Sequence, residues 1–259
     1  MPLLELNDAR IYYELFGSSA APVLVFSNSL GTDLTMWDSQ AAVLSRDFRV
    51  LRYDTRGHGR SSITPGPYSM GQLADDLIGL LDKLELDRVH FCGLSIGGMT
   101  GMSLALRFPQ RLVKVILSNT AAKIGSSEVW NARIDTVRKG GMQSVVPGIL
   151  GRWYTAEFRS ASPEAVESTR RMLLNTPVEG YAGCCAALRD ADLRNEIAGI
   201  HLRVLIIAGA HDPATTPADG RFLAERIAGS RYVELRAAHL SNIEASEAFT
   251  MELSAFLKA

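Results

Sequence analysis

The stretch Gly93-Leu94-Ser95-Ile96-Gly97 constrains this chain more than any other. Before it, the apolar run Val89–Cys92 predicts a buried strand, and after it Met99–Phe108 predicts a helix that ends at Pro109. So tight a strand-to-helix turn leaves no room for side chains two residues before or after its serine, which explains both glycines. The backbone is strained there, and the hydroxyl points out of the sheet beside the first N–H groups of the helix. The stretch therefore predicts a nucleophile elbow with Ser95 as the nucleophile.

A simpler interpretation of this stretch is a glycine-rich turn that only allows close packing. A dinucleotide-binding fingerprint is excluded, because Ser95 stands where that motif has its middle glycine. A nucleophilic serine also needs a base, and the base needs an acid that orients it. If the stretch is a nucleophile elbow, the rest of the chain must therefore supply a base and an acid.

Length and charge limit the classes of function. The 259 residues suffice for one large α/β domain with an inserted subdomain, and 47% hydrophobic residues can fill its core. A formal net charge of −1 without basic or acidic blocks argues against nucleic acid or an anionic membrane as a main partner. Met1–Tyr12 lacks the cationic and apolar regions of a signal peptide, and no apolar run is long enough to span a bilayer. We therefore expect a soluble protein of the cytoplasm.

The three cysteines are Cys92, Cys184 and Cys185, an odd number with two neighbours that would form a bridge only under strain. They are expected to be reduced and buried, as suits a reducing compartment. Metal-ligand spacings such as His-Glu-x-x-His or Cys-x-x-Cys are absent from the sequence, so no metal site is predicted.

Hydrophobic periodicity predicts strands that alternate with helices, which implies a mostly parallel sheet of eight strands with helices on both faces. The predicted strands are a hairpin within Leu3–Leu15 that turns at Asn7-Asp8, then Pro22–Phe26, Phe48–Tyr53, Val89–Cys92, Val113–Ser118, Val204–Ala208 and Tyr232–Leu235. The predicted helices between them are Trp37–Leu44, Leu73–Leu84, Met99–Phe108, Gly220–Ile227 and Glu244–Leu257.

From about residue 125 to residue 195 the pattern changes, because helical segments follow one another without a strand. These segments are expected at 127–139, 142–153, 163–175 and 178–189, and glycine and proline pairs separate them. The sequence thus predicts an α/β core at 1–124 and 196–259, with a helical cap at 125–195 laid over the sheet.

The acid and the base should follow the serine in the chain, at the ends of later strands. Asp212 follows the strand Val204–Ala208, although an aspartate before a proline is also common in turns. Among the five histidines, only His239 comes after this acid and follows a strand end, although a loop histidine is most often just solvated. The joint order Ser95, Asp212, His239 favours a catalytic triad.

Two backbone N–H groups should form the oxyanion hole. One belongs to Ile96, the residue after the nucleophile, and the other to the loop after the third strand, where Leu30 is the candidate. Asn28 and Ser29 are placed to orient that loop, and Ser29 is also a candidate for contact with substrate. The alternative for this loop is an ordinary polar turn.

With these residues placed, the chain resembles the α/β-hydrolase superfamily along its whole length, and within it the 3-oxoadipate enol-lactonases. The resemblance rests on the elbow and on three further stretches: Ser27-Asn28-Ser29-Leu30-Gly31, Ser118-Asn119-Thr120-Ala121-Ala122-Lys123-Ile124-Gly125 and Trp130-Asn131-Ala132-Arg133-Ile134. Most hydrolases have His-Gly where this chain and the enol-lactonases have Asn28-Ser29. One departure is Ile96, where methionine is usual; the change is mild because the backbone N–H is the functional group.

This resemblance implies a substrate, namely a five-membered enol lactone that bears a carboxymethyl group. Ser95 would attack the lactone carbonyl with help from His239 and Asp212, and water would then release 3-oxoadipate without a metal or organic cofactor. The alternatives are a carboxylesterase or a cofactor-free perhydrolase of the same fold, and a non-catalytic ligand-binding member. An intact triad argues against the last. The sequence leaves the oligomeric state open.

A free carboxylate on the substrate needs a partner in the cap. Trp130, Arg133, Ile134 and Val137 fall on one face of the first cap helix, so Arg133 lies within an apolar stripe. A planar guanidinium suits a carboxylate, although the arginine stem can also pack while its head reaches solvent. If Arg133 only packs in this way, another cap arginine, Arg152 or Arg189, is the candidate for the carboxylate. Trp130 joins Arg133 as a candidate, and Trp153 and Tyr154 are weaker candidates that would otherwise belong to the core of the cap.

Overall fold

A computed structural model describes residues 2–6 and 8–259, and within these residues it contains one eight-stranded sheet. The strand order is β1-β2-β4-β3-β5-β6-β7-β8. The strands are β1 (Leu3–Glu5), β2 (Arg10–Phe16), β3 (Val23–Ser27), β4 (Arg49–Tyr53), β5 (Val89–Leu94), β6 (Leu112–Ser118), β7 (Arg203–Gly209) and β8 (Arg231–Leu235). All eight predicted strands are present.

The strands from β3 to β8 run parallel, and only β1 and β2 are antiparallel to their neighbours. The central strand β5 is buried along its whole length, as expected for a strand covered on both faces. β1 pairs with β2 through Leu3 opposite Tyr12, which confirms the predicted N-terminal hairpin. Of its predicted turn pair, Asn7 lies outside the described residues.

The core helices are α1 (Asp38–Leu44), α2 (Met70–Lys83), α3 (Ile96–Arg107), α9 (Pro217–Arg226), α10 (Ser241–Glu244) and α11 (Ser246–Lys258). α2 packs on α3, α1 on α11, and α9 on β7 and β8. α2, α3 and α9 each start three residues earlier than predicted. At α2 and α9 the reason is that Ser69 and Thr216 supply side-chain caps that hydrophobic periodicity does not detect. The predicted C-terminal helix is two helices, with a break at Ala245.

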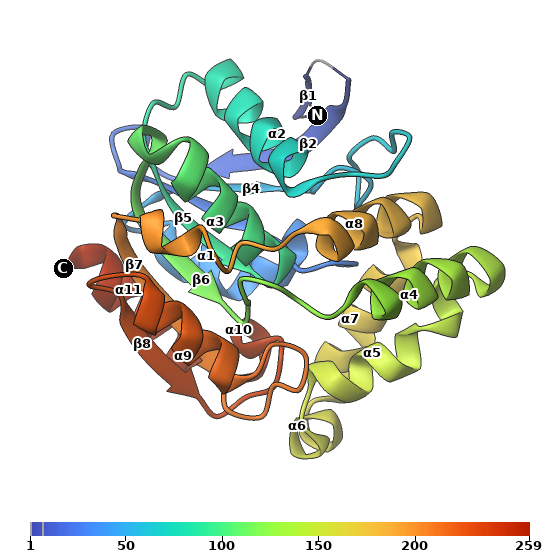
Figure 1. Cartoon of the computed structure of the whole chain (residues 1–259). Coiled ribbons are helices and arrows are strands. Elements are labelled where there is room, and N and C mark those ends of the chain that lie inside the picture. The colour runs from blue at the N-terminus through green and yellow to red at the C-terminus, as the bar shows by residue number, and fades with distance from the viewer. Residues whose placement is uncertain (1, 7) are drawn as a thin grey trace.

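Five helices lie between β6 and β7 and gather to one side of the sheet (Figure 1). They are α4 (Ser127–Gly140), α5 (Val146–Trp153), α6 (Ala156–Ala161), α7 (Pro163–Asn175) and α8 (Val178–Asp190). The predicted helix at 142–153 is a short 3-10 turn followed by α5, and α6 was not predicted. α6 has six residues and none is buried, so it leaves no hydrophobic period in the sequence. The boundaries of core and cap after residues 124 and 195 stay a prediction.

The three cysteines are free and buried, as predicted, and burial raises the pKa of the Cys185 thiol to about 12. In the part of the chain that the structure describes, no helix is both long and apolar enough to cross a membrane.

Buried titratable groups make stability depend on pH. Burial lowers the pKa of His58 and of His90 to about 4, and it raises the pKa of Asp54 to about 6. The unfolded chain binds protons at both histidines below about pH 6.5, whereas the folded chain resists them until about pH 4. Asp54 acts in the opposite sense, because its folded form takes up a proton already near pH 6.

We therefore expect the free energy of unfolding to fall by about 3 kcal/mol between pH 7 and pH 4. Acidification destabilises the fold through the lowered pKa of the two histidines by more than it stabilises the fold through the raised pKa of Asp54. Urea titrations at several pH values would measure it. In His90→Gln, which cannot take up a proton at this position, the fall should be smaller. A free energy of unfolding that stays constant or rises on acidification would contradict the prediction.

Candidate active site

Ser95 sits on the turn between β5 and α3, and its backbone has the strained values that the sequence predicts. Its φ is +59°, a region that non-glycine residues rarely adopt. A Cβ atom at Gly93 would lie 2.2 Å from the carbonyl oxygen of Gly97, and one at Gly97 would lie 2.4 Å from that of Ser27. Both positions therefore exclude any side chain. The Ser95 N–H donates to the carbonyl of Ser118 at 3.0 Å, which fixes the turn against β6.

The candidate base and acid meet at the ends of β7 and β8. His239 Nδ1 lies 2.8 Å from Asp212 Oδ2, and both side chains are almost fully buried. Burial alone would raise the pKa of Asp212, but the charge of His239 and the hydrogen bonds that the carboxylate accepts lower it to about 2. An ionised carboxylate only accepts, so Nδ1 carries the proton and Nε2 is left free to accept one from a nucleophile.

Two side chains that sequence analysis did not single out hold the Asp212 carboxylate. Thr215 donates to it through its hydroxyl at 2.8 Å and its N–H at 3.1 Å, and Asn119 donates through its amide at 2.9 Å. The Asn119 amide also donates to the carbonyl of Ala238 at 3.1 Å, directly before His239. Asn119 has φ +42°, which asparagine tolerates better than most residues, and it follows β6. It is therefore a positioning residue that joins three strand ends.

Replacing Asn119 should misplace the acid and the base without removing either. In Asn119→Ala we expect kcat to fall by about 10- to 100-fold, since a hydrogen bond to a buried charge is worth about 1.5–3 kcal/mol. Steady-state kinetics with thermal melts would test it. Ser241→Ala is the matched control, because Ser241 donates to the Asn119 oxygen and its loss leaves both amide contacts in place. Equal losses in the two variants would show that Asn119 acts only through packing.

Ser95 and His239 line one cavity of about 320 Å³. No hydrogen bond joins their side chains within the described residues; such bonds are often long before substrate binds. Ser29 and Leu30 line the same cavity. Neither the N–H of Leu30 nor that of Ile96 has an acceptor within residues 2–6 and 8–259, so neither donor is used inside the described protein. Of the two residues, Leu30 lines the cavity and Ile96 does not. The Ile96 N–H is the first of α3, where the helix dipole favours negative charge.

The cap closes the cavity with residues from α4, α5 and α8. Trp130, Arg133 and Trp153 line it as predicted, and the Trp153 ring lies 5.8 Å from the His239 ring. Tyr154 was predicted to line it and does not. Its side chain turns into the cap, where its hydroxyl bonds Thr169 at 2.6 Å. Two further cap residues line the cavity: Arg152, which sequence analysis left as an alternative to Arg133, and Tyr181, which it did not place here.

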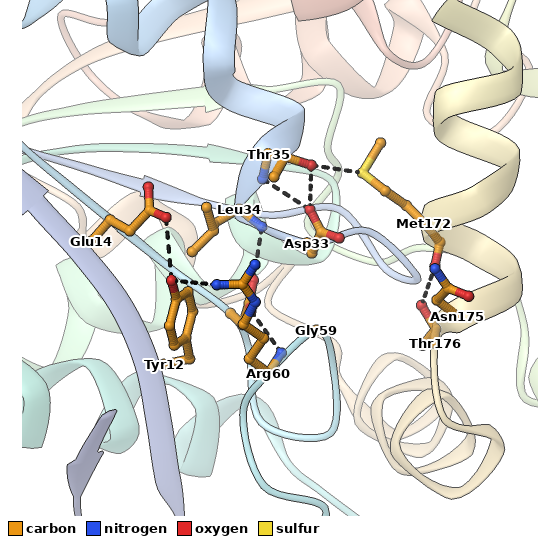
Figure 2. A pocket seen from close by; sticks show the side chains of 11 residues that line it. Tyr12, Glu14, Asp33, Leu34, Thr35, Gly59, Arg60, Met172, Asn175 and Thr176 are labelled. Atoms are coloured by element: carbon orange, nitrogen blue, oxygen red, sulfur yellow. Dashed lines mark hydrogen bonds between the residues drawn. The ribbon is translucent and has the colours of Figure 1, made fainter. Parts of the chain in front are cut away.

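A second cavity, of about 220 Å³, contains neither Ser95 nor His239 (Figure 2). Its charged groups contact one another. The Arg60 guanidinium donates to the Tyr12 hydroxyl at 2.7 Å, and that hydroxyl donates to Glu14 at 3.3 Å. The Asp54 carboxylate accepts from the backbone of Leu34 and Arg60, both at 2.8 Å. Because these groups are already partnered, we assign them a structural role. Among the described residues, no group of three or more His, Cys, Asp or Glu side chains could hold a metal ion.

The sheet order, the elbow at Ser95 and the acid–base pair at later strand ends define the class of α/β hydrolases. A sequence model of the alpha/beta hydrolase fold matches residues 22–143. The chain is 46% identical to 3-oxoadipate enol-lactonase 2 of Acinetobacter baylyi, over 98% of this chain and 96% of that protein. It is 39% identical to 3-oxoadipate enol-lactonase 1 of the same species, over 95% and 92%.

Among solved structures, the enol-lactonase from Burkholderia xenovorans LB400 matches with a TM-score of 0.98 and 49% identity, over 100% of both chains. The chain therefore belongs to the α/β-hydrolase family, where it is similar to enol-lactonases along its whole length. These comparisons confirm the fold, the family and the hydrolase class that the sequence predicts.

Proposed function

We propose that this protein opens the lactone ring of 3-oxoadipate enol-lactone to give 3-oxoadipate, with Ser95, His239 and Asp212 as a catalytic triad. The observation that carries the proposal is the composition of one cavity. Ser95 and His239 lie on its core side, and the guanidinium groups of Arg133 and Arg152 lie on its cap side. A ligand there meets a nucleophile and a cationic wall together, which suits an ester that bears a carboxylate.

In the first step, Ser95 Oγ attacks the lactone carbonyl while His239 Nε2 takes the hydroxyl proton. Asp212 stays ionised and stabilises the imidazolium. The N–H groups of Leu30 and Ile96 donate to the oxygen that becomes negative in the tetrahedral intermediate. The ring C–O bond then breaks, and the His239 imidazolium gives the proton on Nε2 to the leaving oxygen, which makes His239 a base again. The leaving oxygen is an enolate, which needs less help from a proton donor than an alkoxide does. Because the substrate is a ring, this leaving group stays joined to the acyl chain.

In the second step, His239 accepts a proton from water, and the resulting nucleophile attacks the acyl-enzyme at the same carbonyl carbon. The bond to Ser95 breaks as His239 returns its proton to Ser95 Oγ, and the product acid is released and ionises to a carboxylate. The enol becomes a ketone, which makes ring opening effectively irreversible. In the two steps at Ser95 every proton moves between His239 and the reacting oxygens, and the later change from enol to ketone only moves a proton from oxygen to carbon. The proposed mechanism therefore uses no metal and no organic cofactor.

The substrate's own carboxylate is assigned to Arg133, with Trp130, Trp153 and Ser29 as further contacts. Arg133 lies half-buried on the cavity wall, and its one hydrogen bond within the described residues is with the Tyr181 hydroxyl. It therefore has no acidic partner there and is available to an anion. We place the reaction in the cytoplasm, which agrees with three unbridged cysteines.

A carboxylesterase or perhydrolase of the same build is the alternative, and the apolar side chains of Val129, Ile149 and Leu188 on the cavity wall favour neutral acyl chains. The test is ring opening of the enol lactone, followed by the loss of enol absorbance and by NMR of the product. We expect a kcat/KM for the lactone well above that for a neutral ester of similar size. A neutral ester as the better substrate would favour the alternative, and no turnover of either would favour a ligand-binding role.

A further inference from the structure

We infer that Arg133 and Arg152 form one site that holds a single substrate carboxylate between two guanidinium groups, with Tyr181 as the residue that positions Arg133. This inference rests on the proposed function and deepens it, because it adds a second arginine and defines the substrate class as esters and lactones with a carboxylate remote from the scissile bond.

The first observation is that these two arginines differ from all others in the described cap. Six arginines of the cap have partners, which are carboxylates for five of them and backbone carbonyls for Arg159: Arg138 with Glu179, Arg170 and Arg171 with Glu167, Arg189 with Asp190, Arg194 with Asp192, and Arg159 with the carbonyls of Gly151 and Tyr154. Arg152 has no hydrogen bond or ion pair with any described residue, and Arg133 bonds only the Tyr181 hydroxyl. Both line the cavity that contains Ser95 and His239.

The second observation is the charge around them. No aspartate or glutamate is among the described residues that line this cavity. Burial lowers the pKa of Arg152, and the positive charge of Arg133 lowers it further, so the two guanidinium groups are near enough to repel each other. Two half-buried like charges without a counter-charge are unfavourable in the empty protein. An anionic ligand between them removes this repulsion.

The third observation concerns the geometry of the wall. Arg133 comes from α4, Arg152 from α5 and Tyr181 from α8, so three helices converge on one spot. The Tyr181 side chain is 1% exposed, and its hydroxyl accepts from Arg133 Nη1 at 3.3 Å. Because Tyr181 takes only one N–H of Nη1, the other N–H groups of the Arg133 guanidinium stay free for a ligand. Two planar donors from different helices can then bind both oxygens of one carboxylate.

A matched pair of chromogenic esters isolates this carboxylate. In 4-nitrophenyl hydrogen adipate the acyl chain ends in a carboxylate, and in 4-nitrophenyl hexanoate it ends in a methyl group. The quantity to measure is the ratio of kcat/KM for the two esters, in Arg133→Met, Arg152→Met, the double variant and Arg189→Met. Arg189 is the control, because it is a half-buried cap arginine that is paired with Asp190 and does not line the cavity.

We expect each of Arg133→Met and Arg152→Met to lower this ratio by about 30-fold, the lower end for truncating a desolvated charge pair. The double variant should lose less than the product of the two single losses, because both arginines hold the same carboxylate. Arg189→Met should keep the ratio. Adipate should also bind more weakly to both single variants in calorimetry, and Tyr181→Phe should weaken it by a smaller factor.

The possible failures are distinct. If Arg152→Met keeps the ratio and its affinity for adipate while Arg133→Met loses both, the two-arginine site is wrong and the proposed function stands. If losses in the double variant multiply fully, the arginines act independently and the single shared carboxylate is wrong. If the parent protein cleaves neither ester nor the enol lactone, the proposed function itself fails.

Discussion

Ser95→Ala is expected to lower kcat by about six orders of magnitude, because loss of the nucleophile leaves only the oxyanion donors and substrate binding. The fold should persist, since the strained turn is defined by Gly93, Gly97 and the bond from the Ser95 N–H to Ser118, none of which needs the hydroxyl. An alanine at φ +59° is no more strained than the serine that it replaces. Steady-state kinetics on the enol lactone, with thermal melts, would measure both expectations.

The matched control is Ser103→Ala on α3, a buried serine that does not line the cavity. It should keep kcat within a few-fold. A mass increase of the parent protein in rapid-quench spectrometry would locate the acyl group on Ser95, and the increase should be absent in Ser95→Ala. Near-normal turnover in Ser95→Ala would exclude a serine mechanism and direct attention to water activated by His239 alone.

Sequence analysis could bring together the residues that follow strand ends, because local hydrophobic patterns show where a strand ends. Ser95, Asp212 and His239 each follow a short apolar run, and parallel strands bring their carboxyl ends to one edge of the sheet. The structure places Asp212 and His239 in contact there, with Ser95 and His239 on one cavity. Their catalytic roles stay a prediction until variants are measured.

The parts that were missed depend on contacts between distant segments. Asn119 and Asp212 are 93 residues apart, and nothing in either local sequence indicates their hydrogen bond. Helical periodicity places Arg133 on an apolar stripe, but only the packing of α4, α5 and α8 shows that Arg152 and Tyr181 lie beside it. The prediction that Tyr154 lines the cavity is wrong for the same reason, since it also depends on contacts between distant segments. An aromatic at a helix end is equally compatible with a cavity wall and with the core of the cap, and the partner hydroxyl of Thr169 decides for the core.

His239→Gln is expected to lower kcat/KM by about four to six orders of magnitude and to remove its rise with pH. The neutral imidazole is the active form, so activity in the parent protein should increase as His239 loses its proton. Asp212 cannot produce this rise, because its pKa of about 2 keeps it ionised throughout. His58 and His90 cannot produce it near neutral pH either, because burial lowers the pKa of each to about 4. His211→Gln is the control; His211 is exposed beside Asp212 and does not line the cavity.

The double variant Ser95→Ala/His239→Gln separates a base that acts through the serine from one that acts on its own. If His239 only transfers protons for Ser95 and for water at the acyl-enzyme, it has no catalytic role in a variant that lacks the serine hydroxyl. The double variant should then be about as slow as Ser95→Ala alone, because groups that act as a unit do not have additive effects. A further loss of about 100-fold in the double variant would mean that His239 also activates water directly at the lactone carbonyl. In that case Asp212 would still orient the imidazole through the 2.8 Å contact, but no acyl-enzyme would be required.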